Sequence, residues 1–156
     1  MRIRRLGPGD RAEARALFSS MAAVFDEPSE PLDDAFLDAL LGRSDFWALA
    51  AYAGDAMAGG LTAHLLPMTR AASFELFIYD IAVLDEHRRK GIGRALVEHL
   101  RAEAARANVE SVFVAADDED EHALDFYRAL GGEAAPVTMF TFAPLARPTS
   151  RGRARP

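Results

Sequence analysis

The most constraining feature of this sequence is a buried-strand pattern that runs through a basic, glycine-bearing turn into a helix, over residues 79–95. The first backbone N–H groups of a helix lack intrahelical partners, and the helix dipole places partial positive charge beside them. A pyrophosphate can accept hydrogen bonds from these groups, and glycines let backbone amides come close to it. The pattern therefore predicts a phosphate site formed by Arg88, Arg89, Lys90, Gly91, Ile92, Gly93 and Arg94.

The spacing of residues 88–93 matches Arg/Gln-x-x-Gly-x-Gly/Ala and resembles the acetyl-CoA pyrophosphate loop of the GNAT superfamily of N-acetyltransferases. The common nucleotide-binding patterns G-x-x-x-x-G-K-[ST] and G-x-G-x-x-G are absent from the sequence. Residues 123–131, ALDFYRALG, resemble the A-x-x-F-Y-x-x-L-G helix that closes the cofactor groove in the same superfamily. The resemblance implies acetyl-CoA as cofactor, with further contacts from Ile81, Ala82, Val83 and Tyr127.

Hydrophobic periodicity and turn residues predict an alternation of strands and helices. The expected strands are residues 2–6, 46–52, 56–66, 74–83, 111–116 and 137–142, and the expected helices are 11–25, 32–41, 93–107 and 123–130. Asp10 is the expected N-cap of the first helix, and Phe25 falls on its apolar face. The order β-α-α-β-β-β-α-β-α-β is also that of the superfamily. We expect an α/β (α+β) fold of the GNAT type, with a mixed central sheet flanked by helices.

Charge and composition narrow the classes of partner. Residues 1–146 form the expected acetyltransferase domain, with 14 Lys and Arg against 24 Asp and Glu, a net charge of −10. An acidic body argues against nucleic acid and favours a cationic partner. The tail, residues 147–156, holds four arginines and no acid and is expected to be disordered. No membrane span or signal peptide is evident, so a cytoplasmic location is expected.

Cysteine is absent from the sequence, which excludes disulfides, thiolate metal sites and a cysteine nucleophile. Acetyl transfer would then be direct, in a ternary complex of enzyme, acetyl-CoA and amine. The four histidines show no H-E-x-x-H spacing, and the acidic residues show no calcium-loop pattern. No metal is therefore expected.

A narrower resemblance concerns residues 46–51, 65–67, 78–83, 86–89 and 116–121, which look like stretches of aminoglycoside 3-N-acetyltransferases. These enzymes acetylate the 3-amino group of 2-deoxystreptamine antibiotics and so confer antibiotic resistance. The pair Tyr79-Asp80 is the most distinctive piece, since it sits where the acceptor amine of the superfamily meets the thioester. The resemblance implies an aminoglycoside as the polycationic substrate. A homodimer is left open.

Two side chains are candidates for the chemistry. An alkylammonium is no nucleophile, so an acyltransferase needs a base, and Asp80 is a carboxylate within an otherwise apolar strand. A carboxylate satisfied by backbone groups or an arginine is the structural alternative. Tyr127 is the candidate donor to the departing CoA thiolate, with a core aromatic as its alternative. Strict alternation puts Tyr79 and Asp80 on opposite faces, and a β-bulge would re-aim one of them.

Acidic side chains elsewhere are candidates for holding a polycation. Five consecutive acids repel one another, and a bound cation would relieve that cost. The expected substrate-binding set is Tyr79, Asp80, Asp117, Asp118, Glu119, Asp120, Glu121 and, in the loop after the first helix, Asp26. Glu27 and Glu30 of the same loop are further carboxylates that could hold a polycation. Solvated loops are the simpler interpretation of these acids. A polyamine or protein amine as acceptor, and a non-catalytic acyl-CoA-binding module, stay open as alternative functions.

Overall fold

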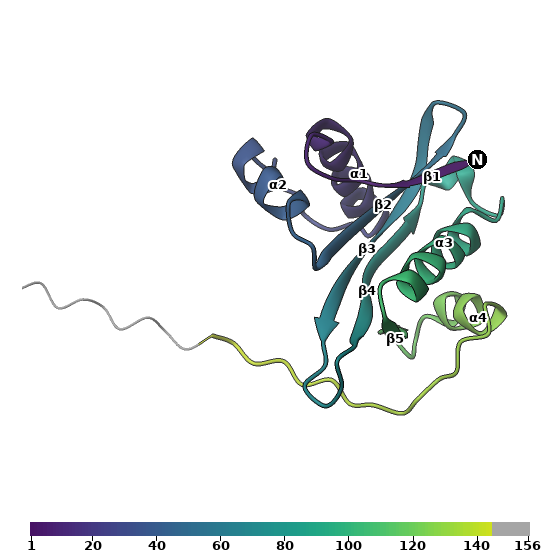
Figure 1. Cartoon of the computed structure of the whole chain (residues 1–156). Coiled ribbons are helices and arrows are strands. Elements are labelled where there is room, and N and C mark those ends of the chain that lie inside the picture. The colour runs from purple at the N-terminus through teal and green to yellow at the C-terminus, as the bar shows by residue number, and fades with distance from the viewer. Residues whose placement is uncertain (145–156) are drawn as a thin grey trace, which may run out of the picture.

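The computed structural model describes residues 1–144 of the chain (Figure 1). The basic tail expected over residues 147–156 lies outside the described residues. The elements are β1 (Arg2–Arg5), α1 (Arg11–Val24), α2 (Asp34–Leu41), β2 (Phe46–Ala53), β3 (Ala56–Pro67), β4 (Phe74–Val83), the 3-10 turn η1 (Asp85–His87), α3 (Ile92–Arg106), β5 (Val109–Val114) and α4 (Glu121–Ala129). Among the helices of residues 1–144, none is long and apolar enough to cross a membrane.

Five strands form one mixed sheet in the order β1-β2-β3-β4-β5. The first four strands pair antiparallel, and β5 pairs parallel to β4. The parallel pair needs a crossover, and α3 supplies it between β4 and β5. This mixed α/β sheet with helices on its faces confirms the predicted fold class.

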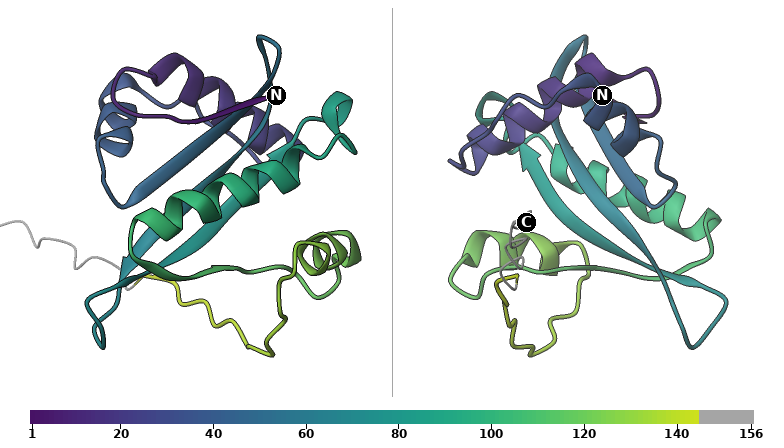
Figure 2. Two further views of the ribbon diagram at one scale, coloured as in Figure 1. Left: turned by 45° about the vertical axis from the view of Figure 1, so that its right-hand side comes forward. Right: turned by 90° about the vertical axis from the view of Figure 1, so that its left-hand side faces the viewer.

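Helices cover both faces of the sheet, as the two views of Figure 2 show. On one face α1 and α2 bury Leu17 and Leu37 against β2 and β3. On the other face α3 buries Leu96 and Leu100 against the central strands. Gly60 of β3 permits the close approach of α1, because a Cβ there would collide with Leu17.

Several predicted boundaries shift for local reasons. The second helix begins at Asp34 rather than residue 32, because the Asp33 side chain accepts a hydrogen bond from Phe36 N (2.7 Å) and caps it. The predicted strand 111–116 lies instead at Val109–Val114. Asp10 is the N-cap residue of α1, yet its carboxylate makes no capping bond. It accepts from both terminal nitrogens of Arg4 (3.0 and 3.1 Å) and from Gly7 N (2.8 Å).

One predicted strand does not form within the described chain. Residues 137–142 belong to no strand, and the chain from 131 to 144 runs away from α4 as an extended segment (Figures 1 and 2). The prediction was wrong because β-propensity and apolar content favour an extended chain but do not supply a pairing edge. The order observed in residues 1–144 therefore ends at α4.

Candidate active site

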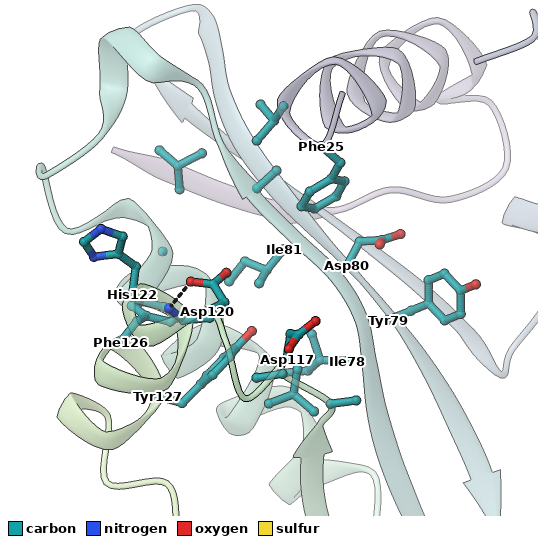
Figure 3. A pocket seen from close by; sticks show the side chains of 18 of the residues that line it. Phe25, Ile78, Tyr79, Asp80, Ile81, Asp117, Asp120, His122, Phe126 and Tyr127 are labelled. Atoms are coloured by element: carbon teal, nitrogen blue, oxygen red, sulfur yellow. Dashed lines mark hydrogen bonds between the residues drawn. The ribbon is translucent and has the colours of Figure 1, made fainter. Parts of the chain in front are cut away.

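The site arises where the two parallel strands separate. β4 pairs with β5 only over Phe74–Ile78, so residues 79–83 of β4 have no neighbour on that side within the described sheet. A cavity of about 790 Å³ occupies the gap (Figure 3). Its walls come from β4, the end of α1, the start of α3, the loop after β5, and α4. Ile81, Ala82 and Val83, which the resemblance implies as cofactor contacts, are among its lining residues.

A β-bulge in β4 sets the direction of the key side chains. Thr62 of β3 pairs with Asp80, while the next residue, Ala63, pairs with Ile78, which leaves Tyr79 as an extra residue. Ile78 therefore packs with the α3 side of the core, whereas Ala82 packs with the α1 side. The expected bulge is confirmed. It lets Tyr79 and Asp80, which strict alternation would separate, both project toward the α1 side of the sheet.

Asp80 is half-buried in the cavity, beneath Phe25 at the end of α1 (Figure 3). Burial raises the pKa of its carboxyl group, and the negative charge of Glu27 raises it further. Thr62 Oγ1 donates a hydrogen bond to Asp80 Oδ2 (3.3 Å), which with His64 opposes that rise in pKa. No arginine or lysine within residues 1–144 forms an ion pair with Asp80. A carboxylate in this environment is suited to accept a proton.

Tyr127 reaches into the cavity from α4, with its hydroxyl group directed between the separated strands (Figure 3). Burial raises the pKa of the Tyr127 phenol, and the nearby charge of Asp120 raises it further. The hydroxyl is therefore protonated across the neutral range and can donate its proton. Phe126 packs against the α3 core, as the sequence suggested.

The turn before α3 has free backbone donors. Arg89 (φ 61°) and Gly91 (φ 78°) both adopt the left-handed conformation, which curls the chain into the helix. The first backbone bond of α3 is donated by Ala95 to Gly91 O (3.0 Å). Within residues 1–144 the amides from Gly91 to Arg94 consequently lack backbone acceptors. A Cβ at Gly91 would meet nothing within 4 Å, so this space is open to an anion.

The side chains of this predicted phosphate site play different parts. Arg88 and Gly93 line the cavity, whereas Arg89, Lys90, Gly91, Ile92 and Arg94 are not among its lining residues. Lys90 Nζ donates to Glu86 O (2.7 Å), and Arg94 Nη2 donates to Ala129 O (3.1 Å). Ile92 is buried in the core, so only its amide is available. Gly93 permits helix packing, because a Cβ there would lie 3.2 Å from the Phe126 ring.

The acidic run contributes only two of its five side chains to the cavity, Asp117 and Asp120. Asp117 Oδ1 accepts from Glu119 N (2.9 Å), and Asp120 Oδ1 accepts from Ala123 N (3.0 Å) as the N-cap of α4. Asp118, Glu119 and Glu121 are exposed and lie outside the cavity lining. Backbone N–H groups and the α4 dipole thus relieve part of the repulsion that the sequence suggested a cation would relieve.

The loop after α1 also contributes only some of its expected side chains to the cavity. Asp26 is not among the lining residues, but its neighbours Phe25 and Glu27 are. Phe25, predicted on the buried face of α1, has 40% of its surface exposed, because α1 ends at Val24 and the chain turns at Asp26 (φ 55°). The break after residue 25 was visible in the sequence. The sequence did not indicate which acidic residue of the loop after the helix would face the sheet.

Comparison with known proteins identifies the family of this chain. Residues 13–131 match the family model described as Acetyltransferase (GNAT) family. The chain belongs to the GNAT acetyltransferase family. No curated protein matches it significantly.

Solved structures add detail to that membership. An aminoglycoside acetyltransferase from an uncultured soil metagenomic sample superposes with a TM-score of 0.87 at 32% identity, covering 93% of this chain and 98% of that chain. A second such enzyme from an uncultured soil metagenomic sample, in complex with sisomicin, gives a TM-score of 0.86 at 29% identity, covering 93% and 96%. A ribosomal-protein-alanine N-acetyltransferase from Brucella melitensis biovar Abortus 2308 shares the fold, with a TM-score of 0.74, 23% identity and coverage of 92% and 99%.

GNAT acetyltransferases use acetyl-CoA, and the site of this member fits that molecule. The free amides at the start of α3 suit a pyrophosphate, while the unpaired edge of residues 79–83 offers backbone groups to amides of the pantetheine arm. Gly91 leaves room beside these amides, and Tyr127 stands across the cavity from β4. When bound, acetyl-CoA supplies the acetyl group as an activated thioester. Among residues 1–144, no cluster of three His, Asp or Glu side chains could hold a metal ion.

Proposed function

We propose that this GNAT member acetylates an aminoglycoside at the 3-amino group of its 2-deoxystreptamine ring, with acetyl-CoA as donor. The observation that carries the proposal is the charge of the cavity. Asp80 lies half-buried in it beside three further carboxylates, those of Glu27, Asp117 and Asp120. Such a cavity favours an acceptor with several ammonium groups. Similarity to aminoglycoside acetyltransferases at about 30% identity supports the same acceptor class.

The geometry suggests how the residues would act. Asp80 accepts a proton from the acceptor ammonium, which frees the nitrogen lone pair to attack the acetyl carbonyl. A carbon–nitrogen bond then forms and the carbon–sulfur bond breaks, while Tyr127 donates its proton or a hydrogen bond to the departing sulfur. With no cysteine in the chain, direct transfer between bound partners is the simplest route.

A thiol-release assay with kanamycin, gentamicin, spermidine and a lysine peptide tests the acceptor class. We expect turnover with the two antibiotics at far lower concentrations than with the other amines. The position of the new acetyl group would then be read from the nuclear magnetic resonance spectrum of the product. Preference for spermidine or the peptide would instead identify a polyamine or protein-amine enzyme. Tight acetyl-CoA binding without transfer to any amine would identify a non-catalytic binding module.

A further inference from the structure

A row of aromatic side chains crosses the face of the sheet that carries α1 and α2. Four of them are successive cross-strand partners, namely Phe46 of β2, His64 of β3, Phe77 of β4 and Phe113 of β5. Phe46 belongs to the core under α1 and α2, and cross-strand partners share a face. Tyr79, the extra residue of the β-bulge, joins the row, with its ring centroid 5.6 Å from His64 and 5.9 Å from Phe77. These five residues are called the aromatic row below.

The aromatic row is buried at one end and open at the other. Phe46 is 7% exposed and packs edge-to-face against Phe18 of α1. Phe113 and Tyr79 are 42% and 63% exposed, although Phe113 lies with its ring centroid 5.2 Å from that of Phe77. The solvated part of an antiparallel sheet normally carries polar side chains. Exposed aromatic rings that contact one another there indicate a binding surface.

The open part of the aromatic row adjoins the candidate active site. Tyr79 lines the cavity of about 790 Å³, and Figure 3 shows Tyr79 and Asp80 on one side of β4 with Tyr127 on the other. His64 lines a second cavity of about 310 Å³, whose other walls come from α2 and Arg43. The contact between the His64 and Tyr79 rings lies between the two cavities. A molecule whose amine reaches Asp80 can therefore extend over the row.

A carboxylate lies on the same face beyond the rings. Glu75 is two residues from Phe77 on β4, so the two side chains share a face, and Ser111 Oγ donates to Glu75 Oε1 (3.4 Å). No arginine or lysine within residues 1–144 forms an ion pair with Glu75. With one place absorbed by the bulge, the Cα atoms of Glu75 and Asp80 lie about 13 Å apart. That span exceeds one sugar ring and fits an acceptor of several linked rings.

We propose that the aromatic row binds the amino sugars attached to the reacting ring of the acceptor, and that Glu75 binds an ammonium group of one of them. This assignment rests on the proposed aminoglycoside acceptor. The apolar C–H face of a sugar ring covers aromatic surface while its hydroxyl groups stay in water. Its ammonium groups are attracted to the ring faces and to the carboxylate. Spermidine and a lysine side chain have no ring to place on this surface, so the row selects glycosides among polycations.

Two acceptors of different size test the subsite. 2-Deoxystreptamine is the reacting ring alone, and kanamycin carries amino sugars on that ring. Thiol release gives kcat/KM for each, and the ratio of the kanamycin value to the 2-deoxystreptamine value reports contacts beyond the reacting ring. Phe113→Leu keeps an apolar side chain but removes the aromatic ring, and Glu75→Gln keeps the size but removes the charge. Each variant should lower the ratio at least about threefold.

Two matched variants complete the test. Phe113→Tyr restores an aromatic ring and should recover the ratio, and Asp55→Asn, at the exposed turn between β2 and β3, should keep the ratio of the unmodified chain. A ratio left unchanged by Phe113→Leu or by Glu75→Gln, even where both rates fall together, would overturn the subsite while the proposed function stands. Absence of turnover with both acceptors in the unmodified chain would instead refute the proposed function, and the subsite with it.

Discussion

Replacing Asp80 by Asn is the most informative single test of the site. The amide is nearly the size of the carboxylate but cannot accept a proton at working pH. Loss of a general base typically lowers kcat by about 10² to 10⁴, or about 2.7 to 5.4 kcal/mol of barrier. The cavity offers poor substitutes, because the carboxylates of Asp117 and Asp120 are already engaged by backbone N–H groups. Glu75, an alternative base on β4, is not among the lining residues. We therefore expect no rescue, and a loss of at least about 10².

The pH dependence of kcat/KM distinguishes a base from a merely structural carboxylate. Burial raises the pKa of Asp80, so the acid limb of the profile should lie above the ordinary aspartate value of about 4. Glu27→Gln removes a nearby negative charge and should move that limb to lower pH. Thr62→Val removes the hydrogen bond that favours the charged form and should move it to higher pH. These two substitutions should not shift the acid limb in opposite directions if a group other than Asp80 titrates there.

The assay is steady-state thiol release across pH, with calorimetric titration of acetyl-CoA for each variant. Asp55→Asn is the matched control, since Asp55 is exposed at the turn between β2 and β3. It should leave kcat and the profile unchanged. Near-normal kcat for Asp80→Asn, with an unshifted acid limb, would refute the assignment of Asp80 as the base.

Three further outcomes follow from the geometry. Gly91→Val should lower the free energy of unfolding by about 1 to 2 kcal/mol, because Gly91 has a φ of 78°. The variant should lose affinity for acetyl-CoA more strongly, and an unchanged calorimetric affinity would contradict the predicted phosphate site. Tyr127→Phe should lower kcat about 10²-fold with unchanged acetyl-CoA affinity, and its loss should remove any basic limb above about pH 10. Asp10→Asn should lower the free energy of urea unfolding by about 1 to 2 kcal/mol near neutral pH, since Arg4 and the Gly7 amide depress the pKa of Asp10. That stabilisation begins to fall below about pH 4 and is lost as pH falls through the depressed pKa of Asp10. The difference between variant and parent should therefore shrink as pH falls below about 4, and a constant difference would contradict this account.

Local patterns were enough to predict much of the framework. The strand, basic turn and helix of residues 79–95 depend on apolar runs, glycines and helix-end chemistry, all of which act between near neighbours. The same holds for the helix that carries Tyr127. Because the predicted phosphate site consists of backbone amides at a helix start, it could be predicted without knowledge of the fold.

Long-range pairing decided the rest. The bulge that turns Tyr79 and Asp80 to one side depends on the register between β3 and β4, and a register shift of one residue reverses every side chain beyond it. Glu27 rather than Asp26 reaches the cavity because of where α1 packs on the sheet. Gly93 serves helix packing because Phe126, far along the chain, lies against it. The apolar pattern of residues 137–142 signalled a strand, but only the tertiary structure showed that its own sheet does not pair with it. Pairing depends on which edge lies within reach, and that is a property of the assembled fold rather than of any local stretch.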